Sequence, residues 1–353
     1  MLKLGSLFDG IGTFPLAARM NGIVPVWASE INKNDISITQ RHFPEMMHLG
    51  SITDLNGGKI PAVDIITFGS PCQNLSTIGN RAGLDGAKSS LFFEAIRIIK
   101  EMRCATNGLH PTIACWENVT GAHFSGNRMD FAAVLSAFSN TQIPMPNSGF
   151  WAGAGMVRGV TPDIAWRILG AHHHGVAQKR RRIFLVADYR GKRAAEILYQ
   201  PEDGKQVFPV VAEGGLSVAH GAGSGPVQAR WPPGTELYAL QGRKMRGAAV
   251  TKDKSQFYGS FGHANDAVPT LLTTDIQVLY AHFPTNPQAN YLRYVTPLEV
   301  ERLMGLPEGW TEYGHDGQRI RDSARYFALG NSIVLPCAAY IMSNIKRVLE
   351  EPV

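Results

Sequence analysis

The feature that most constrains the fold is a repeated alternation of short apolar runs with longer helical patterns in the first half of the chain. Leu2–Phe8 and Asp64–Gly69 are apolar runs of strand type, whereas Leu91–Met102 has apolar residues at helical spacing. The alternation predicts further strands at 25–29, 113–116, 164–169 and 182–187 and helices at 14–20, 34–41 and 131–138. Strands joined by crossover helices form a parallel sheet with helices on both faces. We therefore expect an α/β fold with a doubly wound parallel sheet.

The pattern changes after Asp188. Residues 201–234 are rich in glycine and proline, and no long helical pattern follows before Tyr291. Helical patterns return at 296–304 and 336–350. We therefore expect a larger domain formed by residues 1–188 and 292–353, and a smaller, loop-rich domain formed by residues 189–291.

Composition narrows the class of protein. With 44% hydrophobic residues, the 353-residue chain can bury a sizeable core, and its net charge of +5 is compatible with a polyanionic partner but is weak evidence for one. The four cysteines form no CxxC pair, which argues against a zinc site and a disulfide framework. No apolar run is long enough to span a membrane, and the N-terminus does not resemble a signal peptide. We expect no metal, no membrane association and a reducing compartment.

Two short segments in the first half suit a nucleoside. Phe8-Asp9-Gly10-Ile11-Gly12 follows the first strand and opens a helix, where small residues let the backbone approach a ligand. Glu30 ends the next strand, where a carboxylate can accept ribose hydroxyls. The alternative interpretation is a tight turn and a solvated strand end, and a lone GxG motif does not decide between the two.

Cys72 is the cysteine best placed for chemistry. Ser70-Pro71-Cys72-Gln73 lies just beyond a strand, and ligands of open α/β sheets bind outside the carboxyl ends of the strands. The reactive form of a cysteine nucleophile is the thiolate. The alternative is a small buried side chain, which is the interpretation we adopt for Cys104, Cys115 and Cys337.

Charged residues flank two other strands. Glu117 comes after the strand at 113–116 and should emerge on the same sheet edge as Cys72, although in isolation a loop or capping carboxylate is the simpler interpretation. Arg180 and Arg182 precede an apolar strand and should share a face, where guanidinium groups suit phosphates or a base carbonyl; a solvated basic edge is the alternative. Consecutive histidines at 172–174 cannot all face one ion, so we expect no metal there.

In this order and at similar spacing, these residues resemble the cytosine-5 DNA methyltransferase family of prokaryotic or phage type. The resemblance rests on Phe8–Gly12, Pro71-Cys72-Gln73, Glu117-Asn118-Val119, the Gln178-x-Arg180-x-Arg182 segment and Gly330-Asn331-Ser332. It covers roughly residues 1–188 and 292–353. It implies the Rossmann-like, doubly wound sheet of methyltransferases that use S-adenosylmethionine, and makes 189–291 the target-recognition domain by position.

The resemblance also implies the cofactor-binding residues. These are Phe8, Gly10, Ile11, Gly12, Glu30, Ile31, Ser51, Ile52, Pro71, Leu91, Asn331, Ser332 and Ile333. Two positions depart from the family: Ser51 stands where an aspartate usually contacts the adenine, and Thr13 stands where a second glycine is usual. Both departures concern the cofactor pocket and leave the covalent chemistry untouched.

The implied reaction is methylation of cytosine at carbon 5. Cys72 would add to carbon 6 of a base flipped out of the duplex, Glu117 would hydrogen-bond and protonate N3, and Arg182, helped by Arg180, would hold the base carbonyl. The implied catalytic residues are therefore Cys72, Glu117, Arg180 and Arg182.

Recognition of double-stranded DNA should lie mainly in residues 189–291. Basic residues between Arg230 and Lys254 would contact phosphates, and a few side chains would read base edges. The expected DNA contacts are Ser76, Ile78, Arg81, Arg243, Lys244, Arg246, Lys252, Lys254 and Thr270. We expect a monomer in the cytoplasm of a prokaryotic or phage-infected cell.

Three alternatives remain open. The first is an RNA cytosine-5 methyltransferase, since one branch of the family acts on tRNA, although the long variable segment favours DNA. The second is a cofactor-impaired DNA-binding relic, suggested by Ser51 and Thr13. The third is a dinucleotide-dependent oxidoreductase, which would leave Cys72, Glu117 and the arginines without a joint role.

Overall fold

The computed structural model describes residues 1–70, 90–123, 128–199 and 291–351, with short pieces at 236–241, 262–263, 270, 277–282, 285–286 and 288. The chain forms two compact units: unit 1 comprises Met1–Leu169, Arg181–Lys205 and Ala338–Val353, and unit 2 comprises Gly170–Arg180 and Gln206–Cys337. These boundaries differ from the expected domains chiefly in assigning 170–180 and most of the C-terminal segment to unit 2. Packing units do not reveal which residues recognise DNA, so that functional assignment stays a prediction.

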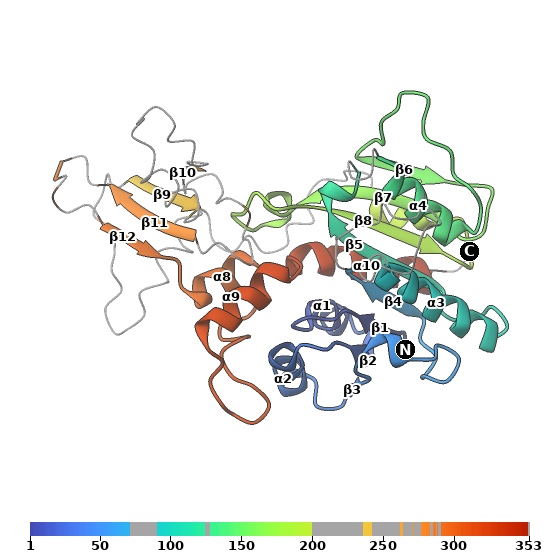
Figure 1. Ribbon diagram of the computed structural model, residues 1–353, viewed down its shortest axis with the longest axis horizontal. Helices are drawn as coiled ribbons and strands as arrows, with labels where there is room; N and C mark the ends of the chain where they lie inside the picture. The colour runs from blue at the N-terminus through green and yellow to red at the C-terminus, as the bar shows by residue number, and fades with distance from the viewer. Residues whose placement is uncertain are drawn as a thin grey trace. The chain divides into compact units, whose positions relative to one another are not determined.

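Unit 1 is built on an eight-stranded sheet with strand order β3-β2-β1-β4-β5-β8-β7-β6 (Figure 1). The strands are β1 (Lys3–Leu7), β2 (Val24–Ser29), β3 (Met47–His48), β4 (Ile65–Phe68), β5 (Ile113–Val119), β6 (Ala154–Val157), β7 (Asp163–Gly170) and β8 (Arg181–Asp188). Pairing is parallel from β3 through β5, as expected, and the α/β fold class is confirmed. The expectation of a wholly parallel sheet is wrong, because β8 pairs antiparallel with β5 and β6 antiparallel with β7. An apolar run predicts a buried strand but does not encode its direction.

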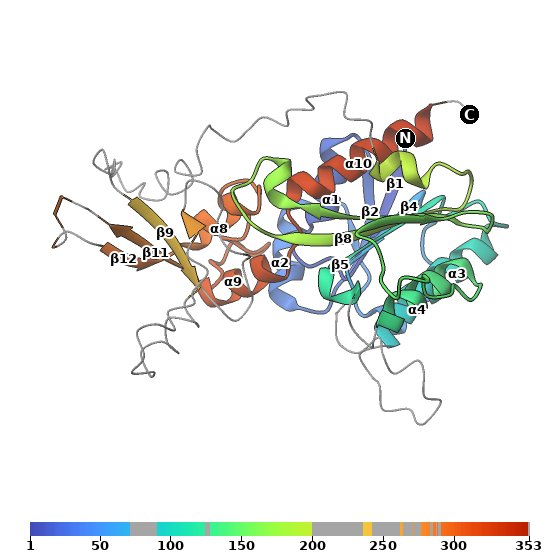
Figure 2. The same cartoon turned by 90° about the horizontal axis from the view of Figure 1, so that it is seen from above.

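Helices cover both faces of this sheet (Figure 2). α1 (Thr13–Met20) and α10 (Leu335–Glu350) lie on one face, and the Asn21 side chain at the end of α1 donates to the backbone carbonyl of Ala339. α3 (Ser90–Ala105) and α4 (Met129–Ser139) lie on the other face. There the rings of Phe68, Phe92 and Phe138 pack with centroids 6.0–6.1 Å apart, which fixes both helices against the end of β4.

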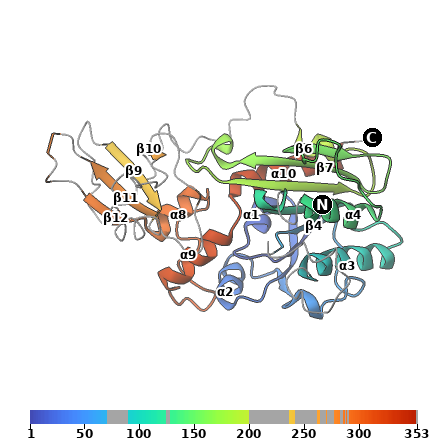
Figure 3. The ribbon, with the colours of Figure 1, turned by 45° about the horizontal axis from the view of Figure 1, so that its top comes forward.

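Unit 2 contains a four-stranded antiparallel sheet with strand order β10-β9-β11-β12 (Figure 3). Its strands are β9 (Glu236–Gln241), β10 (Gly262–His263), β11 (Gln277–His282) and β12 (Tyr291–Tyr294). α8 (Pro297–Leu303) begins with a capping box in which Thr296 and Glu299 bond reciprocally, as its sequence favours.

The sequence patterns miss α9 (Asp322–Asn331), the short α5 (Ala194–Leu198) and the edge strand β6. α9 buries Arg325 at a position where an amphipathic helix would place an apolar residue. The Arg325 guanidinium lies 3.0 Å from the buried carboxylate of Glu301 and donates to the Thr311 hydroxyl, so an ion pair replaces apolar packing.

Two expectations about the described residues concern membranes and metals. None of the helices described is by itself long and apolar enough to cross a membrane; α9 and α10, bent by 43°, meet that criterion only when taken together. The same part of the chain contains no group of three or more histidine, cysteine, aspartate or glutamate side chains arranged to hold a metal ion.

Candidate active site

The turn between β1 and α1 has an unusual backbone. Phe8, Gly10 and Gly12 all have positive φ angles, of 52°, 58° and 77°. Glycine adopts this region without penalty, whereas Phe8 is strained there, and such strain is characteristic of functional turns. The Asp9 amide donates to the Ser29 carbonyl, which ties the turn to the end of β2.

Glu30 links the same two segments. One carboxylate oxygen accepts from the Gly10 amide at 2.9 Å, and the other accepts from the amides of Ile31 and Asn32 at 2.7 and 3.0 Å. A carboxylate has about four acceptor positions. The backbone therefore holds Glu30 rigidly, and its carboxylate can still accept hydrogen bonds from hydroxyl groups of a ligand.

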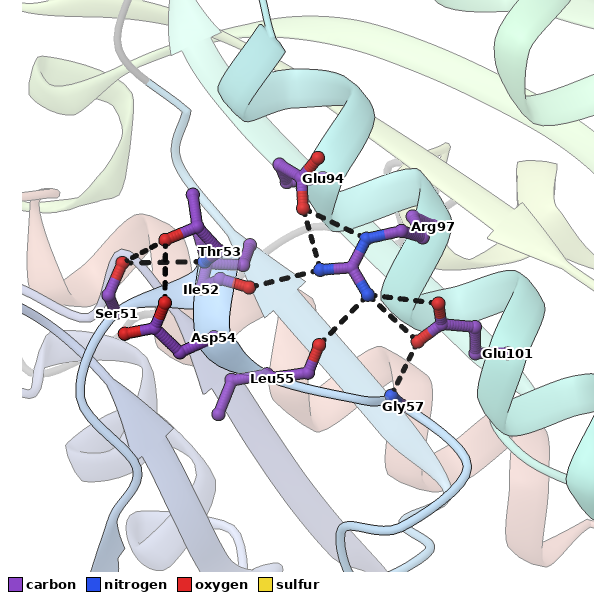
Figure 4. Close-up of polar contacts among 9 residues, drawn as sticks. All are labelled: Ser51, Ile52, Thr53, Asp54, Leu55, Gly57, Glu94, Arg97 and Glu101. Carbon is purple, nitrogen blue, oxygen red and sulfur yellow. Dashed lines mark hydrogen bonds and ion pairs between the residues drawn. The ribbon is translucent and has the colours of Figure 1, made fainter.

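The segment after β3 forms the next part of the site. The Ser29 hydroxyl donates to the Gly50 carbonyl at 2.7 Å, and the Ser51 hydroxyl caps the short helix η1 (Ile52–Asp54) by accepting from the Thr53 amide. Figure 4 shows the Ser51 side chain directed at Thr53. The serine that replaces the family's usual aspartate thus serves as a helix cap.

The sequence interpretation included Asp9 in the Phe8–Gly12 segment but did not single it out as a functional residue. Both of its carboxylate oxygens are sealed from solvent without a hydrogen bond of normal geometry in the described structure. Burial, opposed in part by the Ser6 hydroxyl and reinforced by the charges of Glu30 and Asp35, raises the pKa of Asp9 to about 8. Burial and Glu30 likewise raise the pKa of Asp35 to about 7. A lone aspartate after a strand carries no sequence signal for this behaviour.

These residues fit S-adenosylmethionine, whose sulfonium and ammonium groups are cationic. A Cβ atom on Gly10 or Gly50 would meet no heavy atom within 4 Å, so open space borders both segments. The Glu30 carboxylate, which accepts from the Gly10 amide, places an acidic group beside this turn. Room for a nucleoside beside acidic groups is what a cationic donor requires.

The end of β4 is anchored to β5. Trp116 donates its indole N–H to the Ser70 hydroxyl at 3.1 Å, and the side-chain Nδ2 of Asn118 donates to the Ser70 carbonyl at 3.3 Å. Ser70 therefore lies beside the strand that carries Glu117. The residues that follow it, including the expected nucleophile Cys72 with Pro71, Ser76, Ile78 and Arg81, lie outside the described residues.

Glu117 and Arg182 meet at this edge. Glu117 belongs to β5 rather than to a loop, and its Oε1 lies 3.1 Å from Nε of Arg182 on the antiparallel neighbour β8. Its other oxygen would lie 3.2 Å from a Cβ on Gly69, so a side chain at this position would have to displace the carboxylate by a few tenths of an ångström. The arrangement presents a carboxylate and a guanidinium next to the point where Pro71 and Cys72 follow.

Arg180 does not share this position. It precedes β8, which begins at Arg181, so the expectation that Arg180 and Arg182 share a strand face is wrong. Its Nη2 donates to the carbonyls of Gly330 and Ser332 at 3.0 and 2.7 Å, deep inside unit 2. Its neighbour Gln178 donates to the carbonyl of Leu303. The Gln-x-Arg and Gly-Asn-Ser motifs are thus packed against each other.

The remaining expected residues are spread over both units. Leu91 packs against the unit 1 core, Ile31 and Asn331 are exposed, and Ser332 is buried. Thr270 donates its hydroxyl to the Lys179 carbonyl at 2.7 Å. Arg243, Lys244, Arg246, Lys252 and Lys254 lie outside the described residues. The interpretation of Cys104 as buried is wrong, since it is exposed near the end of α3, whereas Cys115 and Cys337 are buried as expected.

Comparison with known proteins gives distant relatives that align with nearly the whole of this chain. The DNA N-6-adenine-methyltransferase of Escherichia phage P1 is 24% identical over 99% of this chain and 61% of its own length. The type II methyltransferase M1.ScrFI of Lactococcus lactis subsp. cremoris is 26% identical over 99% of this chain and 79% of its own length. The chain therefore spans less than two thirds of the phage protein.

A structural neighbour supports the fold. The crystal structure of S. pombe Dnmt2 methyltransferase matches with a TM-score of 0.63 and 19% identity, covering 99% of this chain and 100% of that one. The family description "C-5 cytosine-specific DNA methylase" matches residues 2–209, more than half of the chain. Because that match covers more than half of the chain, and the eight-stranded sheet and the Glu117–Arg182 pair are consistent with it, the chain belongs to the C-5 cytosine-specific DNA methylase family.

Proposed function

We propose that this protein is a DNA (cytosine-5-)-methyltransferase that uses S-adenosylmethionine and forms a covalent adduct through Cys72. The observation that carries the proposal is the Glu117–Arg182 pair, 3.1 Å apart, beside the anchored end of β4 after which Pro71-Cys72 follows. A nucleophile, a carboxyl group and a guanidinium are the groups that activation of a pyrimidine ring needs.

The proposed reaction begins with addition of the Cys72 thiolate to carbon 6 of cytosine. Glu117 supplies a proton to N3, and Arg182 holds the carbonyl oxygen, so the negative charge that develops on the ring is neutralised. Carbon 5 gains enamine character and attacks the donor methyl group. Loss of the proton on carbon 5 to solvent then expels Cys72 as the thiolate, and the N3 proton returns to Glu117, which restores the aromatic ring.

S-adenosylmethionine supplies an electrophilic methyl group when it is bound. The turn around Gly10, the Glu30 carboxylate and the segment at Ser51 and Ile52 would hold its nucleoside part. Gly10 and Gly50 border open space, and Glu30 retains acceptor capacity. The strand ends of β1, β2 and β4 lie at one edge of the sheet, which would bring the methyl group to the same edge as Glu117.

The DNA contacts belong to the same proposal. A cytosine inside a duplex cannot present carbon 6 to a thiolate, so the base must leave the stack. Residues 189–291 would supply the sequence-specific contacts, with Arg243, Lys244, Arg246, Lys252 and Lys254 near the phosphates or base edges. Arg180 would act indirectly, by holding the Gly330–Ser332 segment.

The test is the identity of the modified base. DNA and tRNA from cells that express the protein are digested to nucleosides, and bisulfite sequencing locates any 5-methylcytosine in the DNA. We expect 5-methylcytosine in DNA within one sequence context. Methylation confined to tRNA would identify the RNA branch, and N6-methyladenine, the product named for the phage P1 relative, would overturn the proposed chemistry.

The covalent step has its own test. DNA containing 5-fluorocytosine should trap the wild-type protein, because fluorine cannot leave from carbon 5 as a proton does. Cys72→Ser should abolish the trapped adduct and turnover. Cys104→Ser, a change at an exposed cysteine on α3, is the matched control and should retain both. An adduct formed equally well by Cys72→Ser would sink the assignment.

A further inference from the structure

The guanidinium of Arg97 joins α3 to the segment that follows Ser51 (Figure 4). Nη1 donates to the Leu55 carbonyl at 2.9 Å, and Nη2 donates to the Ile52 carbonyl at 3.2 Å. Both carbonyls belong to or directly follow η1, which Ser51 caps from its other end. The Ile52 carbonyl also accepts from the Leu55 amide, so Arg97 adds a second bond there and ties both ends of this short helix to α3.

Two glutamates on α3 hold the Arg97 guanidinium in place. Glu94 accepts from Nε at 2.8 Å and from Nη2 at 2.6 Å, and Glu101 accepts from Nη1 with both oxygens at 2.9 Å. These contacts are at i−3 and i+4 spacing on the helix, so they orient the planar group toward the carbonyls. A lysine ammonium has three donors on one atom and cannot reach all these acceptors at once.

The same segment is attached to α3 at a second point. Glu101 accepts from the Gly57 amide at 2.7 Å, and a Cβ on Gly57 would lie only 2.2 Å from the Ile98 carbonyl. The backbone at Gly57 therefore lies directly against the helix. Arg97 and Glu101 together fix residues 52–57 on α3, although this segment and the two α3 residues are more than 40 positions apart in sequence.

We propose that Arg97 is a positioning residue of the donor pocket: by fixing residues 52–55 on α3, it sets where Ser51 and Ile52 meet the adenosine part of S-adenosylmethionine. The inference rests on the proposed function. Arg97 would act on the donor indirectly, through the backbone of Ile52, whose side chain is buried. Loss of its two carbonyl contacts should loosen donor binding without altering the Glu117–Arg182 edge.

The test compares Arg97→Lys and Arg97→Gln with Arg103→Lys. Arg103 is on the same helix, donates to the Pro111 carbonyl at 2.8 Å and stacks 4.3 Å from the Tyr189 ring, so it is a matched control away from η1. Donor affinity is measured by isothermal titration of the full chain with S-adenosylmethionine, and thermal unfolding of each free variant is measured in parallel. We expect the Arg97 variants to bind the donor roughly tenfold more weakly, because binding must then order residues 52–55 without the two hydrogen bonds that hold them in the free wild type. Arg103→Lys should lower the unfolding temperature and keep wild-type affinity.

Steady-state kinetics should separate positioning from catalysis. Arg97→Lys should raise KM for the donor, with kcat at saturating donor near the wild-type value. If Arg97→Gln does not fold, Glu101→Gln, which weakens the contacts to Gly57 and to Arg97, should still weaken donor binding about two- to threefold. Wild-type affinity in every Arg97 and Glu101 variant would overturn the inference alone. Donor binding by the wild type without methyl transfer would overturn the proposed function alone, and a wild type that does not bind the donor would overturn both.

Discussion

Replacing Asp9 with asparagine should change how the stability of the protein depends on pH. The Asp9 carboxyl has both oxygens sealed from solvent, and burial raises its pKa from 3.8 to about 8, with Glu30 and Asp35 adding like charge. Between these two values the folded protein keeps a proton that the unfolded chain has lost. Stability therefore falls as pH rises through this window and levels off above about pH 8.

The magnitude follows from one proton. A difference of one bound proton changes the free energy of unfolding by about 1.4 kcal/mol per pH unit. Titration of Asp9 should therefore lower the free energy of unfolding of the wild type by about 2.7 kcal/mol as the pH rises from 5 to 7. Asp9→Asn removes the titrating group and should remove that part of the slope. The absolute stability of the variant also includes the burial of an amide, so the comparison depends on slope and not on the value at one pH.

The assay is denaturant unfolding of the free protein from pH 5 to pH 9, for wild type, Asp9→Asn and Asp35→Asn. Burial and Glu30 raise the pKa of Asp35 to about 7, so its contribution to the slope should end about one pH unit earlier than that of Asp9. Parallel pH profiles for wild type and Asp9→Asn would show that Asp9 titrates alike in the folded and unfolded states, and would refute the reasoning.

The remaining predictions concern the site and its supports. Gly69→Ala places a Cβ 3.2 Å from the Glu117 carboxylate and should lower kcat while donor affinity, measured by titration, stays unchanged. Ser51→Asp should keep the cap on η1 and, if the serine merely lacks an adenine contact, tighten donor binding roughly two- to twelvefold; weaker binding would mean that the pocket has adapted to serine. Arg180→Gln loses bonds to the Gly330 and Ser332 carbonyls and should reduce the free energy of unfolding by about 1.5–3 kcal/mol in denaturant titration. Replacing Lys252 and Lys254 with alanine should weaken binding to all duplexes. The slope of log affinity against log salt concentration should become shallower by the amount expected for about two lost phosphate contacts.

The amino-acid sequence by itself determined the α/β class, and it predicted the edge of the sheet where we propose that the chemistry lies. Apolar runs such as Asp64–Gly69 are bounded by turn residues, and helices such as Leu91–Met102 carry a continuous apolar face, so both are encoded locally. The parallel pairing of β4 with β5 puts Glu117 near the end of β4, because the carboxyl ends of neighbouring parallel strands share an edge; its expected proximity to Cys72 stays a prediction.

Only the tertiary structure decided the direction of β8 and the separation of Arg180 from Arg182. Two arginines with alternate spacing look equivalent in sequence, yet one is buried against the Gly330 and Ser332 carbonyls and the other faces Glu117. The charge state of Asp9 and the reach of Arg97 to Ile52 likewise depend on neighbours remote in the chain. Periodicity reports which side of an element is apolar, but a polar side chain acquires its role from the groups that folding brings within a few ångströms of it.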